Sequence, residues 1–295
     1  MSELYSGRPV YARRMFRHGA ALVAALLCAG CAGPTLTFPN ATPGAPLTVP
    51  AEEFRPEGRG PFPAVVLLHG CHGVSASNRN WARWFRDLGY VALIVDSWAP
   101  RGIGDACVPV DPDPVPNTAR FDDTVGALRY LHSQAYVDRA RVGIIGWSNG
   151  GVFSMAAVNG PSLQRARARG VEMPEPGFRA AIGVYPGGCW SLVRERVVRP
   201  LLVLIGDADD WTLPSECVQM VTAMSALGSD ATIVLYPGAV HYFDVEGQSR
   251  RVLPEVENRN RPGSCCGATV GYDAAAAADA HRRVREFFGY HLGGR

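Results

Sequence analysis

Residues 142–151 read Val142-Gly143-Ile144-Ile145-Gly146-Trp147-Ser148-Asn149-Gly150-Gly151, and this stretch decides the fold of the 295-residue chain. An apolar run typical of a buried strand passes through Gly-x-Ser-x-Gly into a run of small and apolar residues typical of a helix. At so tight a turn the serine backbone is strained and its hydroxyl projects clear of the sheet. Glycines suit both sides of the serine because a Cβ would collide with the neighbouring strand or helix. Ser148 is therefore the predicted nucleophile.

The segments around this stretch alternate between strand and helix. Short apolar runs predict strands near 47–54 and at 63–68, 90–95, 142–145, 180–185, 200–205 and 232–236. Helices are predicted at 81–88, 121–131, 151–158, 214–227 and 272–292. Strands that are apolar throughout and alternate with helices are typical of an α/β fold with a mostly parallel, doubly wound sheet flanked by helices. The polar stretches 99–119, 161–178 and 244–271 lie near strand ends, where loops build functional sites in such sheets.

The composition fits one globular domain. Hydrophobic residues make up 47% of the chain and charged residues 19%, which supports a sizeable core and argues against disorder. The formal net charge of +2 is too small for a nucleic-acid surface, so we expect no nucleic-acid partner. Because the chain shows no repeat and no second core, we expect a single domain over residues 47–295.

The N-terminus has the features of an export signal. Three arginines at 13, 14 and 17 precede the apolar run 19–27, which is too short for an ordinary membrane anchor. Ala29-Gly30-Cys31 resembles the end of a bacterial lipoprotein cleavage box, although Cys28 stands where an aliphatic residue is usual. We expect a signal peptide over 1–31, a lipid on Cys31 that attaches the protein to a membrane, and a flexible tether over 32–46. These features predict an exported protein, either periplasmic or a membrane-anchored lipoprotein; a buried N-terminal helix is the alternative reading.

A nucleophilic serine needs a base to take its proton and an acid to orient that base. His241 follows the predicted strand 232–236, and three acids follow the predicted strand 200–205. The order serine, acid, histidine is the one that accompanies this type of nucleophile turn. Asp209, three residues past Gly206, is the preferred acid. Asp210 is the second choice and Asp207 the third, and the acids that do not orient the histidine are expected to form turns.

The negative charge that develops on a substrate oxygen needs backbone N–H donors. One donor is predicted at Asn149, directly after the nucleophile, and the other at Cys71, in the loop after the strand 63–68. A metal site is the rival interpretation of that loop, because His69, Cys71 and His72 are all ligand types. No second cluster in the sequence completes a coordination shell, so we expect no metal and no cofactor.

Five stretches, in order along the chain, resemble the dienelactone hydrolase family of α/β-hydrolases; they are residues 63–73, 89–102, 146–151, 206–212 and 236–243. The resemblance covers about residues 45–292. It implies the α/β-hydrolase fold and a Ser148, Asp209 and His241 triad that hydrolyses carboxylic esters or lactones through an acyl-enzyme. It also implies that Arg101 lies near the active site, where founding members hold a substrate carboxylate with an arginine. A solvated loop charge is the alternative reading of Arg101.

The chain departs from the founding members at three places. They use a cysteine nucleophile, a glutamate at the position of Gly70, and a second arginine where this chain has the acidic segment 243–246. These differences argue against dienelactone activity and leave esterase chemistry. Relatives with the same 206–212 loop imply a Cys189–Cys217 bridge, with Cys71–Cys107 as a second pair; buried free thiols are the alternative. Cys265 and Cys266 are adjacent in the sequence and are not expected to bond to each other.

Two other functions remain as alternatives to a small-molecule esterase or lactonase. A serine peptidase of the prolyl-oligopeptidase type has the same fold, but it normally needs an additional domain. A lipid-anchored binding protein without turnover is the other alternative, although the intact set of Ser148, Asp209 and His241 argues against it. The sequence predicts a small ester or lactone as the substrate and says nothing of the oligomeric state.

Overall fold

The computed structural model describes residues 35–108 and 117–293. The predicted signal peptide and Cys31 lie outside the described residues. From Ala32 to Arg295 the chain forms one compact unit. Among the described helices, none combines the length and the hydropathy needed to cross a bilayer.

The core of the protein is an eight-stranded, mostly parallel sheet with the strand order β1-β2-β4-β3-β5-β6-β7-β8. Strands β3 to β8 pair in parallel, and β1 and β2 join antiparallel beside β4. Every residue of β4, β6 and β7 is buried, as the unbroken apolar runs predict. The strands are Thr35–Pro39 (β1), Thr48–Phe54 (β2), Phe62–Leu68 (β3), Val91–Val95 (β4), Val137–Trp147 (β5), Ala181–Val184 (β6), Leu201–Gly206 (β7) and Ala231–Tyr236 (β8).

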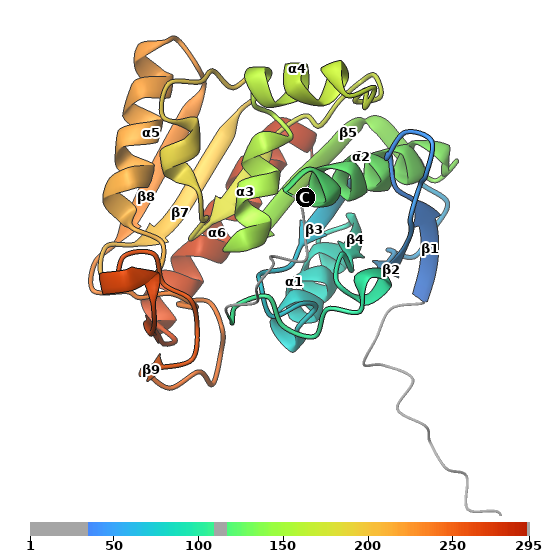
Figure 1. Ribbon diagram of the computed structural model, residues 1–295. Helices are drawn as coiled ribbons and strands as arrows, with labels where there is room; N and C mark the ends of the chain where they lie inside the picture. The colour runs from blue at the N-terminus through green and yellow to red at the C-terminus, as the bar shows by residue number, and fades with distance from the viewer. Residues whose placement is uncertain (1–34, 109–116, 294–295) are drawn as a thin grey trace, which may run out of the picture. The chain divides into compact units, whose positions relative to one another are not determined.

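Helices cover both faces of the sheet. On one face α1 and α6 pack together, with the rings of Phe85 and Phe288 5.9 Å apart. Figure 1 shows α6 behind the strands and α3 and α5 in front of them. The helices are Ala76–Asp87 (α1), Asn117–Ser133 (α2), Asn149–Ala156 (α3), Gly160–Ala168 (α4), Pro214–Ala226 (α5) and Ala274–Leu292 (α6), with 3₁₀ turns at Ala99–Arg101 (η1), Cys189–Leu192 (η2) and Pro262–Ser264 (η3).

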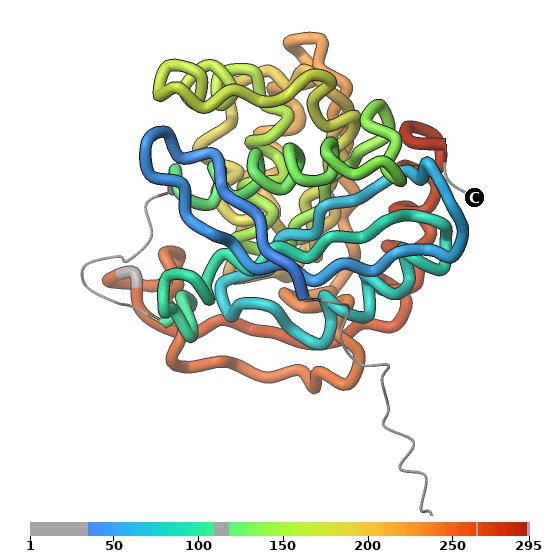
Figure 2. Tube along the Cα trace, turned by 90° about the vertical axis from the view of Figure 1, so that its right-hand side faces the viewer, coloured from blue at the N-terminus to red at the C-terminus, as the bar shows by residue number. Residues whose placement is uncertain are grey.

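The segment predicted as a flexible tether, 32–46, contains a strand instead. Residues Thr35–Pro39 pair along their whole length with β2, and the side chain of Phe38 in this strand is buried. The side chain of Asn40 then donates a hydrogen bond to Asp123 in α2, at 3.0 Å. The prediction of a tether is wrong for this part because the alternating Thr-Leu-Thr-Phe pattern covers an otherwise open edge of β2. Figure 2 shows this blue strand along the near side of the molecule.

Two of the polar stretches contain elements that the sequence did not predict. In the stretch 161–178, α4 begins at Gly160, where the Asn159 side chain caps it by accepting a hydrogen bond from the Ser162 N–H. In the stretch 244–271, Arg251–Leu253 (β9) and Ala268–Val270 (β10) form a short antiparallel pair.

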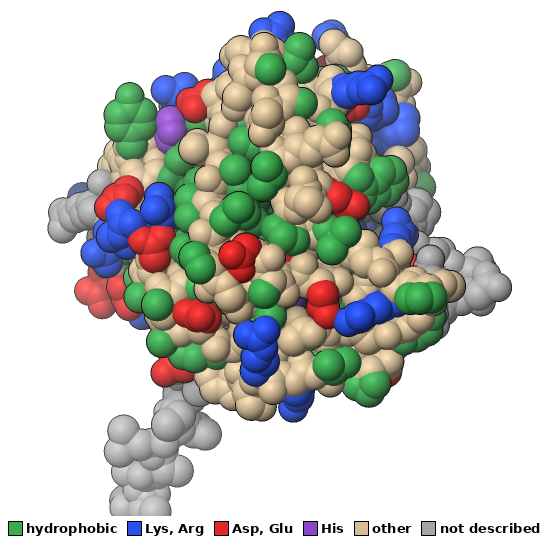
Figure 3. Space-filling view, turned by 90° about the vertical axis from the view of Figure 1, so that its left-hand side faces the viewer, with side chains coloured by type: hydrophobic (Ala, Val, Ile, Leu, Met, Phe, Trp, Pro, Cys, Tyr) green, Lys and Arg blue, Asp and Glu red, His purple; other side chains and the backbone are tan. Residues whose placement is uncertain are grey.

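The edge of the main sheet opposite β1 is β8. Figure 3 faces this side of the molecule, where apolar side chains gather in the middle of the surface.

Candidate active site

Ser148 lies in the turn between β5 and α3, as the sequence predicts. Its backbone has φ 52°, in the left-handed region that a residue with a Cβ rarely adopts. A Cβ at Gly146 would lie 2.2 Å from the Gly150 carbonyl oxygen, and a Cβ at Gly150 would lie 2.2 Å from the Leu68 carbonyl oxygen. The glycines therefore allow the strand, the turn and the helix to approach more closely than any side chain permits.

His241 and Asp209 form a buried pair at the ends of β8 and β7. The Nδ1 atom of His241 lies 2.7 Å from Oδ2 of Asp209, and both side chains are inaccessible to solvent. The backbone N–H groups of Trp211 and Thr212 each donate to Oδ1 of Asp209 at 2.9 Å. These bonds hold the carboxylate in place, so that it can fix the tautomer and orientation of the imidazole.

The second nitrogen of the His241 ring, Nε2, is buried and has no hydrogen-bond partner among the described residues. The ring contacts Trp211, at 4.8 Å between centroids, and Nδ1 lies 3.3 Å from Oγ1 of Thr212. Trp211 and Thr212 line the same cavity as Ser148. His241 thus lies behind the residues that line the cavity. Its Nδ1 bonds to Asp209, and its Nε2 bonds to none of the described residues.

The other two candidate acids point elsewhere. Asp207 accepts a hydrogen bond from the Gly238 N–H at 2.6 Å, which fixes the turn after β8. Asp210 accepts bonds from the Thr269 N–H at 2.7 Å and from Arg261, which connects it to β10. Of the three neighbouring aspartates, Asp209 is the one that contacts His241.

The loop after β3 lies directly over the nucleophile turn, and a Cβ at Gly70 would lie 3.6 Å from the Ser148 Cβ. His69 Nδ1 lies 2.6 Å from the Gly70 carbonyl oxygen, and its Nε2 accepts a bond from the Ser97 N–H at 3.2 Å. These two contacts place the ring proton on Nδ1. Burial, and then the nearby charge of Arg120, lower the pKa of His69, so the ring is neutral at neutral pH.

The Cys71 N–H belongs to the same peptide plane as the Gly70 carbonyl. Because a trans peptide points its C=O and N–H in opposite directions, the bond from His69 to the Gly70 oxygen turns the Cys71 N–H away from the His69 ring. The Cys71 carbonyl is held by Trp98 Nε1 at 2.7 Å and by the Ala106 N–H at 3.0 Å. Across the described part of the chain, no hydrogen bond uses the N–H of Cys71 or of Asn149.

The disulfide Cys71–Cys107 holds this loop from the other side, as the family resemblance implies. Cys107, His72 and Asp105 offer ligand atoms that lie within 4.8 Å of one another. However, the Cys107 sulfur is bonded to Cys71, and His72 Nδ1 pairs with Asp105 at 2.8 Å. Both nitrogens of His69 are also in hydrogen bonds, so two of the three members of the predicted rival set, His69 and Cys71, have no ligand atom to offer in this arrangement.

A cavity of about 360 Å³ opens in front of Ser148. Its lining combines aromatic rings with charged and polar groups. This volume is within the range typical of small-molecule sites. The aromatic members of the lining are Trp98, Phe153, Trp190 and Trp211, and the charged members are Arg120, Glu216, Glu257 and Arg259.

Arg101 does not line this cavity. Its guanidinium forms a two-pronged ion pair with Asp123, at 2.8 and 3.0 Å, and donates to the Ser97 carbonyl oxygen at 2.6 Å. These contacts oppose the role in holding a substrate carboxylate that the family resemblance implies, because both terminal nitrogens of the guanidinium already bond to Asp123. Arg120, in α2, is the arginine that lines the cavity beside Ser148.

Asp244 connects the histidine loop to the rest of the site. It is buried and accepts hydrogen bonds from Trp81 Nε1 at 2.9 Å, Trp147 Nε1 at 2.8 Å and the Tyr185 hydroxyl at 2.6 Å. Burial, and then the charge of Asp244, raise the pKa of Tyr185. The acidic residue in this segment, which stands where founding family members carry an arginine, therefore faces inward and joins α1, β5 and β6 to the segment that carries His241.

Among the described residues, every non-glycine residue with positive φ lies at this site. The non-glycine residues with positive φ are Ser148, Tyr185 at 35° and Tyr242 at 64°. The Tyr185 ring packs 4.3 Å from the ring of His241, and Tyr242 directly follows that histidine. Such strain is retained where the surrounding structure enforces a functional geometry.

The structure also forms the Cys189–Cys217 disulfide, which joins η2 to α5 beside the loop that carries Asp209. A third disulfide joins the adjacent Cys265 and Cys266, so the expectation that these two do not pair is wrong. A bond between adjacent cysteines closes an eight-membered ring, and the expectation followed from the strain of such a ring.

The sequence did not identify Arg120, Asp244 or Tyr185 as parts of the site. The partners of Arg120 come from the loop after β3 and from α3, and those of Asp244 come from three separate elements. No local spacing reveals such contacts. Arg120 lies just before the predicted helix 121–131, in a stretch that also contains Asn117, Asp122 and Asp123, so the sequence around it carries no signal.

Residues 49–292 match the sequence profile described as the Dienelactone hydrolase family. Among curated proteins, the carboxymethylenebutenolidase of Pseudomonas putida is 25% identical over 241 residues, which cover 78% of this chain and 86% of the relative.

Two solved structures share the fold. A dienelactone hydrolase-like promiscuous phosphotriesterase from metagenomic libraries has a TM-score of 0.61 at 19% identity and covers 88% of this chain and 99% of its own. The propionate-bound esterase 2 of Thermogutta terrifontis has a TM-score of 0.60 at 17% identity and covers 90% of this chain and 95% of its own. The predicted α/β-hydrolase fold is thus confirmed.

Proposed function

The chain belongs to the dienelactone hydrolase family of carboxylic ester hydrolases, and on that premise we propose that Ser148, Asp209 and His241 form its catalytic triad. The substrate is a small carboxylic ester or lactone. The observation that carries the proposal is the buried contact of 2.7 Å between His241 Nδ1 and Asp209 Oδ2, at the wall of the cavity that contains Ser148. This arrangement leaves Nε2 of His241 as the base for the serine.

The reaction proceeds in two steps. Ser148 Oγ attacks the carbonyl carbon of the ester while His241 Nε2 takes the hydroxyl proton. The tetrahedral intermediate carries its negative oxygen toward the N–H groups of Cys71 and Asn149, and it collapses when the leaving alkoxide takes the proton back from Nε2. Water, deprotonated by the same nitrogen, then attacks the acyl-serine ester and releases the carboxylic acid, which restores Ser148.

The shape of the cavity supports small substrates. Its volume of about 360 Å³ is near the lower end of the range for small-molecule sites. The rings of Trp98, Phe153, Trp190 and Trp211 offer apolar and aromatic surface to the acyl group and the alcohol. A short ester or a lactone fits this lining.

The test uses 4-nitrophenyl acetate and a fluorophosphonate probe. Wild-type protein is expected to hydrolyse the ester and to be labelled at Ser148, whereas Ser148→Ala loses both properties. Ser133→Ala, an exposed serine at the end of α2, is the matched control and retains both. Ester turnover or labelling that survives in Ser148→Ala would reject the triad.

The same experiment separates the alternatives. Turnover of a peptide 4-nitroanilide without turnover of esters would favour a peptidase of the prolyl-oligopeptidase type. A protein that neither turns over esters nor reacts with the probe would favour a binding protein. The contact of His241 with Asp209 supports a serine hydrolase over a binding protein, and the assays above separate the esterase from the peptidase, which shares this contact.

We also propose that the protein is exported and that a lipid on Cys31 attaches it to a membrane. Support comes from the arginines, the apolar run and the Ala29-Gly30-Cys31 segment at the N-terminus. In bacterial cells fed radioactive palmitate, the full chain should incorporate label and fractionate with membranes, and Cys31→Ser should do neither. Unlabelled, soluble wild-type protein would rule out the anchor.

A further inference from the structure

Arg120 is a buried cation that has no carboxylate partner among the described residues. Its residue is 2% exposed, and in the described ranges no acid lies within ion-pair distance of its guanidinium. The nearest candidate, Asp123, is bonded to Arg101 and Asn40 instead. Because burying an unpaired charge is costly, buried charges are ordinarily paired. An unpaired cation in the wall of the cavity therefore calls for an explanation in terms of the reaction.

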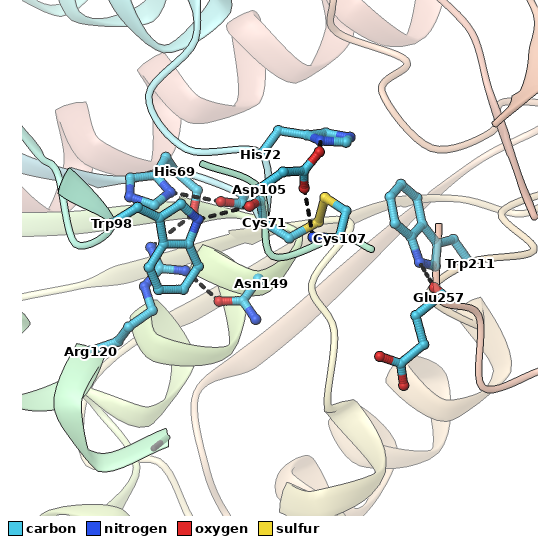
Figure 4. Close-up of a disulfide and its surroundings, with 11 residues drawn as sticks. His69, Cys71, His72, Trp98, Asp105, Cys107, Arg120, Asn149, Trp211 and Glu257 are labelled. Atoms are coloured by element: carbon cyan, nitrogen blue, oxygen red, sulfur yellow. Dashed lines mark hydrogen bonds and ion pairs between the residues drawn. A yellow bond between two sulfur atoms is a disulfide. The ribbon is translucent and has the colours of Figure 1, made fainter. Parts of the chain in front are cut away.

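The guanidinium of Arg120 connects two separate segments. Its Nη2 donates to the His69 carbonyl oxygen at 2.9 Å, and its Nη1 donates to the side-chain oxygen of Asn149. It also stacks over the rings of Trp98 and Phe153, with 4.6 and 5.2 Å to the centroids. Figure 4 shows the guanidinium between Trp98 and Asn149, beside the loop that carries Cys71.

Both segments contribute to the proposed oxyanion hole. His69 precedes the Gly70–Cys71 peptide, whose N–H is one donor, and Asn149 provides the other donor from its own backbone. Arg120 lies in α2 and bonds to both donor segments, so a third element of the fold fixes their positions. The arginine therefore holds the distance between the two N–H groups.

We propose that Arg120 is a positioning residue of the oxyanion hole, which sets the Cys71 and Asn149 donors and supplies unpaired positive charge beside them. This inference rests on the proposed function. A neutral ester gains little from that charge, whereas the tetrahedral intermediate carries a full negative charge on its oxygen. The charge therefore acts mainly on the transition state, and its effect is large in a buried site of low dielectric.

Arg120 gives up no proton in this role. Burial lowers the pKa of its guanidinium to about 9, so the group stays positively charged at neutral pH. The planar fork reaches both acceptors at once, which the single ammonium group of a lysine does not do. The charge and the geometry are therefore separable by substitution.

The experiment compares Arg120→Met and Arg120→Lys with the wild-type protein. With 4-nitrophenyl acetate, Arg120→Met is expected to lower kcat by about 10- to 100-fold and to change KM by less than about twofold. The inhibition constant of phenylboronic acid, which forms a tetrahedral anion on the serine, should weaken by a similar factor. Arg120→Lys keeps the charge and should recover part of both losses.

A second variant leaves the arginine in place and gives its charge a partner. Asn149→Asp retains the backbone donor and gives Arg120 a carboxylate partner, so kcat should fall about 10-fold or more while the fold is kept. If Arg120→Met does not fold, Asn149→Asp tests the role of Arg120 in its place. Arg169→Met is the matched control, because that arginine bonds to Asp122 on the same helix but lies outside the cavity lining. It should leave kcat and boronate affinity unchanged.

The outcomes separate this inference from the proposed function. Wild-type kcat in Arg120→Met or in Asn149→Asp would overturn the role of Arg120 and leave the triad standing. A fall in kcat with unchanged boronate affinity would also overturn it, because a loss of oxyanion stabilisation must weaken binding of the tetrahedral boronate as well. A change confined to KM for anionic esters would reassign Arg120 to substrate binding. A wild-type protein without ester turnover would remove both proposals.

Discussion

At the scale of single residues, hydrogen-bond direction separates three acids that are almost adjacent in sequence. Asp207 bonds to the turn after β8, Asp210 bonds to β10, and Asp209 bonds to His241. The role of each aspartate in this loop follows from the direction in which the backbone points its side chain, and not from its residue type. The oxyanion loop follows the same rule, because one contact from His69 orients the Cys71 N–H.

Asp209→Asn should lower kcat by about 10³- to 10⁴-fold, because an amide stabilises the wrong tautomer of His241 and does not stabilise the imidazolium. Steady-state hydrolysis of 4-nitrophenyl acetate measures the loss. Asp210→Asn is the matched control, and its kcat should stay within a few-fold of the wild-type value. If the two variants exchanged these phenotypes, Asp210 would be the orienting acid.

His69 makes the stability of the protein depend on pH. Burial lowers its pKa in the folded protein below the ordinary value of 6.5, so below pH 6.5 the unfolded chain takes up a proton that the folded chain refuses. The free energy of unfolding should therefore fall as the pH drops below 6.5, with a slope of up to about 1.4 kcal/mol per pH unit from this one group.

Urea denaturation at pH 5 to 8 tests this, with His69→Asn as the comparison. The asparagine amide can still donate to the Gly70 carbonyl but does not titrate. His132 and His291 also have lowered pKa values, and they contribute equally to both proteins. An unchanged pH slope in His69→Asn would mean that His69 is not the source.

At the scale of elements, Asp244 joins α1 and the ends of the neighbouring strands β5 and β6 to the segment that carries His241. Trp81 belongs to α1, Trp147 ends β5 and Tyr185 follows β6, and all three donate to one carboxylate. Asp244 lies three residues past His241. The segment that carries the base is therefore fixed to the strand that carries the nucleophile, and we expect stability and catalysis to depend on the same carboxylate.

Asp244→Asn should reduce the free energy of unfolding by about 2–4 kcal/mol, because an amide leaves at least one buried donor without an acceptor. It should also lower kcat, since the His241 segment loses its link to β5. Urea denaturation and ester hydrolysis measure the two effects. Asp279→Asn, which breaks only exposed ion pairs of α6, should cost less than about 1 kcal/mol and serves as the control. Equal effects of the two substitutions would contradict the role given to Asp244.

At the scale of the whole molecule, the structure extends the domain toward the N-terminus. Residues 35–39 add the eighth strand, and the Asn40 side chain bonds to Asp123, the partner of Arg101. The edge strand is therefore connected through two side chains to the loop that follows β4. A domain that begins at residue 47 would expose the edge of β2 and the pocket that Phe38 fills.

A chain that begins at Leu47 should be less stable than one that begins at Ala32 by at least about 3 kcal/mol, the usual cost of emptying a buried phenylalanine site. Urea denaturation of the two chains measures the difference. Phe38→Ala in the longer chain should account for most of it. Equal stability of the two chains would return residues 35–39 to the role of a tether.

The sequence by itself determined seven of the eight strands of the sheet, the nucleophile turn and the candidate acid and base. These features are written locally: buried parallel strands are continuous apolar runs, and a tight turn needs glycines at fixed positions around Ser148. Asp209 and His241 were found because the ends of parallel strands meet at one edge of the sheet.

Only the tertiary structure decided the partners of side chains that lie far apart in the chain. Arg101 pairs with Asp123 and not with the cavity, Arg120 takes the place beside Ser148, and Asp244 turns inward. Spacing in the sequence predicts the direction of a side chain only within its own element. Which groups it meets depends on how several elements pack, because hydrogen bonds and ion pairs require contact within a few ångströms.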